Sequence, residues 1–467
     1  MSTETSLTTT PARPQVPRGV ATAGLATSMF LIILDAAMVN LAGRAIREGL
    51  ELTATELTVV ASSYLVAFAG LLLLGGRLAD VLGGRRVFLA GMAVYLAASA
   101  FCALAVSGPM LIAGRIGQGA GAAIVVPSAL ALALALHRSP AERARVVGIW
   151  GAVAGGGSLL GVSLGGTLTQ VWDWQSVFWA PVPFGIVSAL IVLRSVPALR
   201  GRSGRFDALG AITITSGICA VAFGMVYAAE SRWSEPGAFI AIAAGLAFLV
   251  AFVIAEHRST HPLVPLVVFR RGPVVRASVI VVLLGATLSS MFFFLPLYEQ
   301  EVLGMDALTS GLAQIPLALM IIVGSATAPL VARAIGLSRA LSAGLALLLA
   351  GFLWLTLNPA TDGFVHLMGA FVLIGGGFSL GLVNAIAMAV RDSGEGESGL
   401  LSGLVNAAQQ VGGAVGLATL ADIAIGAAGT QGEIEFSTAF VSEAALILVA
   451  LALSLIPADR TKRGSAT

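Results

Sequence analysis

Residues 76–86 read GRLADVLGGRR and separate two apolar runs, at 57–76 and 87–106. Each run is long enough to cross the hydrocarbon core of a bilayer as a helix, and a lone spanning segment must be helical because lipid offers its backbone no partners. The glycines allow a tight turn, and Arg85 and Arg86 mark that turn as cytoplasmic by the positive-inside rule. The stretch therefore predicts a hairpin of two membrane-spanning helices.

The rest of the 467-residue chain repeats this pattern of apolar runs joined by short polar turns. Hydrophobic residues make up 57% of the chain and charged residues only 11%, and the mean hydropathy is +0.95. A soluble domain needs more surface charge than this. We predict an all-α polytopic membrane protein with fourteen transmembrane helices. The predicted spans are 20–43, 57–76, 87–106, 109–136, 146–170, 176–194, 208–229, 237–256, 276–298, 310–332, 340–357, 364–390, 399–426 and 437–457.

The distribution of basic residues predicts the orientation of these spans. With the N-terminus inside, all but four of the 26 Lys and Arg residues fall on the cytoplasmic side. Arg44, Arg47 and Arg232 lie outside, and Arg115 lies within a span. Both termini are then cytoplasmic, and the basic loops face anionic lipid rather than nucleic acid. Lys462 is the only lysine, which together with abundant Ala and Gly indicates a GC-rich bacterial genome, such as that of an actinobacterium.

Four motifs carry a resemblance to a known family. Residues 76–86 resemble motif A of the major facilitator superfamily, in its usual place between spans 2 and 3. Residues 34–40, LDAAMVN, are similar to the span 1 signature of the fourteen-span drug–proton antiporter branch, and residues 111–119, LIAGRIGQG, resemble motif B. The glycines that match motif C, the antiporter signature of span 5, are Gly148, Gly157, Gly161, Gly165 and Gly166. Val162 stands where that motif usually has a proline, which leaves uptake open beside export.

The resemblance implies two six-helix bundles with pseudo-twofold symmetry that rock about a central cavity, with two spans inserted between them. It implies a transporter rather than an enzyme, acting as a monomer. The implied organisation is a disordered cytoplasmic tail at 1–18, an N-terminal bundle at 19–200, the inserted spans with their linkers at 201–262, a C-terminal bundle at 263–458 and a cytoplasmic tail at 459–467.

The same resemblance assigns roles to individual residues. The implied conformational motifs are Gly76, Asp80, Gly83, Arg85 and Arg86 after span 2, together with the five span 5 glycines. The candidates for lining the substrate cavity are Asn40, Tyr64, Gln118, Gln314, Asn384, Asn406 and Gln410.

Charged side chains inside a span are costly, so each is a candidate for function. At 1.5 Å per residue, Asp35 and Arg115 lie about 5 Å and about 11 Å outward of the centres of their spans, at similar depth. We interpret Asp35 as the proton carrier and Arg115 as its partner. A static ion pair that holds two spans together is the alternative. Glu443 in span 14 and Asp422 near an outer helix end are weaker candidates.

No pattern in the sequence predicts a cofactor or a metal site. A phosphate-binding loop needs a Gly-Lys-Ser/Thr run, and the only lysine is in the C-terminal tail. His257 and His261 are four residues apart but have no further ligand nearby. Cys102 and Cys219 lie in separate apolar runs and are interpreted as small core residues. The energy source we expect is therefore the proton gradient.

The leading functional hypothesis is export of small, largely apolar organic molecules, such as a drug or an antibiotic, in exchange for protons by alternating access. Its partners would be the small-molecule substrate, protons and membrane lipid. Uptake, or transport of a lipid or nutrient by the same fold, is an alternative. A membrane-embedded enzyme or a sensor is the alternative from another class. The GxSxG patterns at 161–165 and 377–381 lie inside apolar helices, not in the strand–turn–helix setting that a hydrolase elbow needs.

Overall fold

The computed structural model describes eight stretches of the chain, and their regular secondary structure is α-helix throughout. The described residues are 18–137, 139–197, 208–230, 234–258, 271–357, 363–391, 397–427 and 434–456. Apart from Arg18, the two predicted tails lie outside these residues, as do most of the linkers around the inserted spans and the side chain of Asp80.

Each half of the molecule is a bundle of long helices with short helical segments at its breaks. The first half consists of α1 (Arg18–Leu41), α2 (Gly43–Gly49), α3 (Ala54–Leu82), α4 (Gly84–Ala103), α5 (Gly108–Leu136), α6 (Pro140–Trp172), α7 (Ser176–Trp179) and α8 (Pro181–Ser195). Two helices follow it, α9 (Ala208–Glu230) and α10 (Pro236–Arg258). The second half consists of α11 (Gly272–Glu301), α12 (Ala307–Ala313), α13 (Ile315–Ile335), α14 (Leu337–Leu357), α15 (Gly363–Val390), α16 (Glu397–Ala427) and α17 (Phe436–Leu455).

The membrane spans found in the described residues are consistent with the fourteen predicted from the sequence. Within the described residues, 13 helical segments are long and apolar enough to cross a bilayer, two of them counted across the short breaks between α7 and α8 and between α12 and α13. The remaining predicted span is α9, whose apolar part covers Ile212–Met225. The all-α polytopic architecture is therefore confirmed.

Helix ends are set by local turn chemistry. Thr53 and Ser139 each form a reciprocal capping box, at the starts of α3 and α6, which satisfies backbone donors that the first turn leaves free. Asp306 caps α12 by accepting from the backbone N–H of Thr309 at 2.7 Å, and this bond holds the pKa of its carboxyl below the usual range. The polar breaks between spans are thus specified by single residues.

Two glycines make the sharp turns at equivalent places in the two halves. Gly83 lies between α3 and α4 with φ of 95°, and Gly336 lies between α13 and α14 with φ of 90°. Side chains with a Cβ rarely adopt this left-handed backbone, so glycine is required at both turns. The first turn is the predicted motif A loop, and the second repeats its geometry after the corresponding helix of the other half.

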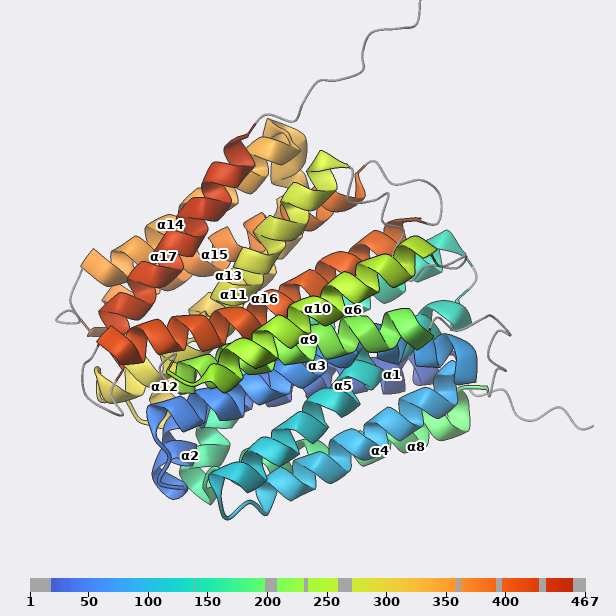
Figure 1. Cartoon of the computed structure of the whole chain (residues 1–467), viewed down its shortest axis with the longest axis horizontal. Coiled ribbons are helices and arrows are strands. Elements are labelled where there is room, and N and C mark those ends of the chain that lie inside the picture. Colours follow the sequence, from blue (N-terminus) through green and yellow to red (C-terminus); the bar gives the residue numbers. More distant parts are fainter. Residues whose placement is uncertain are drawn as a thin grey trace, which may run out of the picture.

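The two halves lie one above the other in Figure 1, with α9 along the seam between them. On one side of the seam α9 packs against α3 of the first half, and on the other against α16 of the second half. The more exposed α10 covers α9. The inserted pair therefore bridges both bundles rather than extending one of them.

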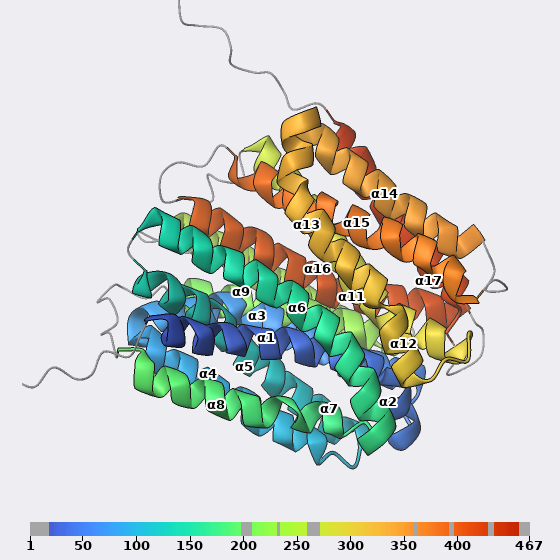
Figure 2. The same ribbon diagram turned by 180° about the vertical axis from the view of Figure 1, so that it is seen from behind.

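The two short helices α2 and α12 lie at the same end of the molecule, and the halves meet there (Figures 1 and 2). We call this end the closed end. α1 begins and α17 ends at the opposite end, toward which the long helices of the two halves diverge.

Glycines bring α1 and α6 into backbone contact. A Cβ added at Gly161 would lie 2.6 Å from the Ala37 Cβ and 2.8 Å from the Leu34 carbonyl oxygen, and one at Gly165 would lie 2.8 Å from the Met38 Cα. Such small-residue stripes are how helices approach closely in membranes. Gly148, although it matches motif C, has nothing within 4 Å of its added Cβ and makes no such contact.

This contact gives a matched pair of substitutions on one helix. Gly161→Ala is expected to lower the thermal unfolding midpoint of the purified protein, because the added methyl overpacks the α1–α6 contact, at a cost of about 1–3 kcal/mol. Gly156→Ala meets nothing within 4 Å and should leave the midpoint unchanged or raise it, since alanine is the better helix former. Equal midpoints for the two variants would contradict the packing described here.

Candidate functional site

Asp35 of α1 and Arg115 of α5 lie together inside the first half. The Arg115 Nη1 is 3.6 Å from the Asp35 Oδ2, and the two side chains are 3% and 0% exposed. Neither side chain therefore faces an open cavity in this conformation. The pair is the one salt bridge with both partners buried among the residues that the structure describes.

Gln118 connects the two charges. Its Nε2 donates to both Asp35 carboxylate oxygens at 3.4 Å and to the Ser99 Oγ at 3.1 Å, while its Oε1 accepts from the Arg115 Nη1 at 3.0 Å. Gln118 follows Arg115 by three residues, so both project from the same face of α5. A residue that we took for a cavity candidate is therefore the bridge of the buried pair.

Aromatic side chains and α4 complete this cluster. The Arg115 guanidinium lies 4.4 Å from the centre of the Tyr64 ring, a cation–π contact. The Tyr95 hydroxyl lies beside the Asp35 carboxyl but is buried without an aligned hydrogen bond within the described part of the chain. Sequence interpretation missed Tyr95 and Ser99, and it took the buried Cys102 for a core residue without placing it at this site. The spacing of four and three residues places all three on one face of span 3.

The chemistry of the buried pair allows two distinct states. With Arg115 in place, its charge and the Gln118 amide stabilise the Asp35 carboxylate. Removing one partner of a buried pair leaves an uncompensated charge at a cost of about 3–5 kcal/mol. If the helices separate the two side chains, a proton on Asp35 removes that cost. The arrangement can therefore exchange a cation contact for a proton.

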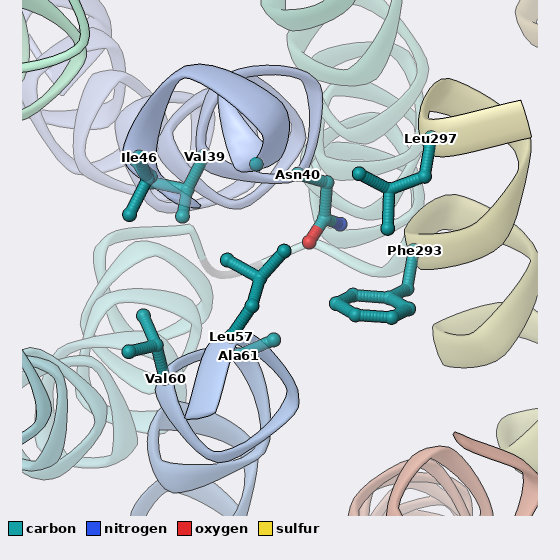
Figure 3. A pocket seen from close by; sticks show the side chains of 9 residues that line it. Val39, Asn40, Ile46, Leu57, Val60, Ala61, Phe293 and Leu297 are labelled. Atoms are coloured by element: carbon teal, nitrogen blue, oxygen red, sulfur yellow. The ribbon is translucent and has the colours of Figure 1, made fainter. Parts of the chain in front are cut away.

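Asn40 lies at a small pocket near the closed end, at the interface of the halves. Figure 3 shows its amide beside apolar side chains from α1, α3 and α11. The lining residues are Val39, Asn40, Gly43, Ile46, Leu57, Val60, Ala61, Phe293 and Leu297. The free volume of about 10 Å³ is near the minimum that one water needs, so the pocket is too small for a drug here.

The remaining cavity candidates do not gather at one site. Asn384 is buried and donates to the Leu380 carbonyl of its own helix at 2.8 Å. Asn406 is exposed on α16, and Gln410, one turn further along, is partly exposed. Gln314 is buried in a second polar cluster, in the other half.

This second cluster centres on Glu299, which the sequence interpretation had left just outside span 9. The structure continues α11 to Glu301, so Glu299 is buried in its last turn. Its carboxylate accepts from the Ser310 hydroxyl and, at 3.0 Å, from the Gln314 Nε2. The cluster ties the end of α11 to α12 and to the start of α13.

The two residues after Glu299 hold the halves together at the closed end. The Gln300 Nε2 donates to the Leu41 carbonyl at 3.0 Å, and the Gln300 carbonyl accepts from the Arg44 Nη1 at 2.7 Å. The Arg47 Nη2 is 2.9 Å from the Glu301 Oε1. We call these five residues the latch.

Close backbone approach between α6 and α12 adds a second contact across the halves. A Cβ added at Gly166 would lie 2.2 Å from the Ala307 carbonyl oxygen, and one at Gly311 would lie 2.3 Å from the Val162 carbonyl oxygen. Glycine is therefore required on both sides. Gly166 faces the other half, whereas Gly161 and Gly165 face α1, so α6 makes both contacts.

The motif A residues lie at the opposite end, within the first half. Arg85 donates from its Nη2 to the Leu193 carbonyl of α8, while Arg86 is exposed. The added Cβ of Gly76 would reach only the Pro127 ring, at 3.8 Å. Through Arg85, the turn between α3 and α4 is tied to the last turn of α8, as expected of a contact between helix ends.

Comparisons with known proteins agree with this architecture. A model of the Major Facilitator Superfamily matches residues 25–417. The cephamycin export protein CmcT of Amycolatopsis lactamdurans is 36% identical over 92% of this chain and 91% of its own length. A puromycin resistance protein of Streptomyces alboniger is 35% identical over 86% of this chain and 80% of its own. The chain belongs to the Major Facilitator Superfamily, which confirms the resemblance drawn from the motifs, and family and fold indicate a transporter rather than an enzyme.

Solved structures agree on the fold. A peptide transporter of the POT family, described as auto-inhibited, has a TM-score of 0.72 with 18% identity, over 95% of this chain and 98% of that one. A bacterial homologue of the lysosomal transporter Spinster, in an inward-facing and unoccupied conformation, has a TM-score of 0.67 with 14% identity, over 95% of this chain and 97% of that one.

The α6–α12 contact predicts how the closed end is held. Gly166→Val is expected to open the closed end, because the added side chain costs about 1–3 kcal/mol in steric overlap. At about 1.4 kcal/mol per tenfold, this cost raises the open population by roughly 5-fold to 100-fold. The measurement is the rate at which a water-soluble maleimide labels an Asn40→Cys variant, corrected for the parent with its native cysteines. Gly148→Val is the matched control, because a Cβ added at Gly148 meets nothing within 4 Å. Labelling that is equally slow in both variants would refute the role of this contact.

Proposed function

We propose that this chain exports small, largely apolar organic molecules, antibiotics among them, in exchange for protons, by alternating access between its two halves. The observation that carries the proposal is the buried Asp35–Arg115 pair with its Gln118 bridge. It occurs in a chain whose relatives include a cephamycin export protein and a tetracenomycin C resistance and export protein.

Coupling follows from linkage between two sites. A proton on Asp35 frees Arg115 from its partner, and so favours the arrangement in which α1 and α5 no longer hold the pair. If substrate binding favours the paired arrangement, bound substrate lowers the affinity for the proton, and a bound proton lowers the affinity for substrate by the same factor. One site then carries protons inward as the other carries substrate outward.

The proposed orientation places the closed end outside the cell. Both termini are then cytoplasmic, in agreement with the basic loops. The membrane is the plasma membrane of a bacterium, such as the Amycolatopsis and Streptomyces hosts of its relatives. The latch and the α6–α12 contact serve as the outer gate, shut in this conformation. The chain works without a cofactor, as a monomer surrounded by lipid.

The energy source is tested by puromycin efflux from cells of a hypersensitive host, with ATP maintained. We expect a protonophore to abolish concentrative export, because no nucleotide-binding pattern is present in the sequence. Cephamycin and tetracenomycin C serve as further probes, chosen from the relatives. Export that continues unchanged after the proton gradient has collapsed would overturn the proposal.

The role of Asp35 is tested by a conservative exchange. Asp35→Asn is expected to fold, because the amide keeps hydrogen bonds within reach, but to lose proton-driven concentrative export while keeping downhill exchange. Asp35→Glu should retain partial activity with a shifted pH optimum. Substrate-induced proton release from purified protein in weak buffer is the direct measurement. Equal release from the wild type and Asp35→Asn would favour the static ion pair instead.

A further inference from the structure

Glu443 lies well inside α17, seven residues after the helix begins at Phe436. Its side chain is 0% exposed, and within the described residues neither carboxylate oxygen has a hydrogen-bond partner. It shares the buried face of α17 with Phe440, Ile447 and Ser454. Asp35 has a cation and an amide, and Glu299 has two donors, whereas neither oxygen of the Glu443 carboxyl has a partner within the described residues.

Contacts on both sides of Glu443 fix its surroundings. Toward the closed end, the Tyr298 ring of α11 packs edge-on against Phe436 and Phe440, at 5.6 Å and 5.3 Å between ring centres. Toward the other end, the Ser454 and Ser342 hydroxyls are hydrogen-bonded at 2.8 Å, which holds α17 against α14. The helix between these contacts packs into an apolar core. Members of that core on the helices beside α17 include Phe294, Leu348 and Phe352.

Charged groups on the helices packed against α17 lie near their ends. Arg276 of α11 donates to the Ile456 carbonyl, thirteen residues or roughly 20 Å beyond Glu443 along the helix axis. Arg339 of α14 lies one turn before Ser342, which bonds Ser454, and so is also remote. The groups toward the closed end are Tyr298, Glu299 and Glu301 of α11 and Asp422 of α16. None of these hydrogen-bonds to the Glu443 carboxyl within the described part of the chain.

A charged carboxylate without partners in an apolar core is far more costly than a neutral carboxylic acid. The acid therefore carries a proton in this conformation. We propose that Glu443 is a second proton-binding site, in the C-terminal half, which holds its proton while the closed end is shut and exchanges it with the outer solution when that end opens. The inference rests on the proposed proton coupling, but its test does not require transport.

The end of α11 provides the gate for this site. Tyr298 packs on Phe440, which lies one turn before Glu443 in α17. The three residues after Tyr298 hold other parts of the molecule: Glu299 holds α12 and α13, Gln300 holds Leu41 and Arg44, and Glu301 holds Arg47. Because these four residues are consecutive in one helix, opening the latch must also shift Tyr298. Water then reaches Glu443, and a carboxyl group in water ionises at neutral pH.

The position of Glu443 matches that of Asp35. Asp35 lies six residues before the end of α1, and Glu443 lies seven residues after the start of α17, each about 10 Å from the closed end along its helix. Each half thus holds one buried acid at the same depth. The first is neutralised by a cation and the second, in our proposal, by a proton.

Infrared spectroscopy of the purified protein tests the protonated state directly. At neutral pH the wild type should show the carbonyl stretch of a protonated carboxylic acid, Glu443→Gln should lack it, and Glu443→Asp should shift it. Glu299→Gln is the control, since that acid is buried elsewhere in the same half and its loss should leave the Glu443 band in place. Identical acid bands in the wild type, Glu443→Gln and Glu443→Asp would overturn the proposal.

The gate is tested by the same band in a protein whose α6–α12 contact is weakened. Gly166→Val should lose the Glu443 band at neutral pH, whereas Gly148→Val should keep it. A band that persists in Gly166→Val, although maleimide labelling shows that the closed end has opened, would make Glu443 a static acid and overturn the proposal. Neither measurement uses substrate, so failure of antibiotic export and failure of this inference are distinguishable.

Discussion

Lipid gives polar groups no partners, and most features of this molecule follow from that constraint. The backbone must be helical in every span. Side-chain hydroxyls such as those of Ser62 and Thr287 donate hydrogen bonds to backbone carbonyls of their own helices. Charged side chains inside the spans must face the protein interior and contact a partner. Asp35 pairs with Arg115, and Glu299 accepts hydrogen bonds from Ser310 and Gln314. Each buried charge therefore fixes how particular helices sit against one another, and moving those helices changes its energy.

The two halves share one fold but use it differently. The first half holds its acid in a polar cluster contributed by α1, α3, α4 and α5. The second half places its polar cluster at the end of α11, where it is continuous with the latch. The inserted α9 packs on α3 and α16, so it connects the halves along the side. The buried ion pair therefore belongs to one half, and the polar cluster beside the latch belongs to the other.

Much of the fold could be predicted from the sequence, because membrane spans are long and their flanking charges are biased. The family follows from the motifs at residues 76–86 and 111–119, and the comparisons confirm it. The similar depth of Asp35 and Arg115 was readable from their positions, but their 3.6 Å approach and the Gln118 bridge depend on helix rotation. Glu299 was missed because α11 runs past the predicted end of span 9. The proposed roles of all these residues remain predictions.

The contact between α6 and α12 is made by main-chain atoms and glycines, and it carries no side chain that a transported molecule would recognise. The residues that shape the pocket, such as Asn40 and Phe293, belong to other helices. The contact between the halves and the lining of the pocket are therefore encoded at separate positions. Pocket residues can be replaced one at a time while the glycine contact is inherited unchanged. Variation within such a scaffold then requires no simultaneous change where its two halves meet.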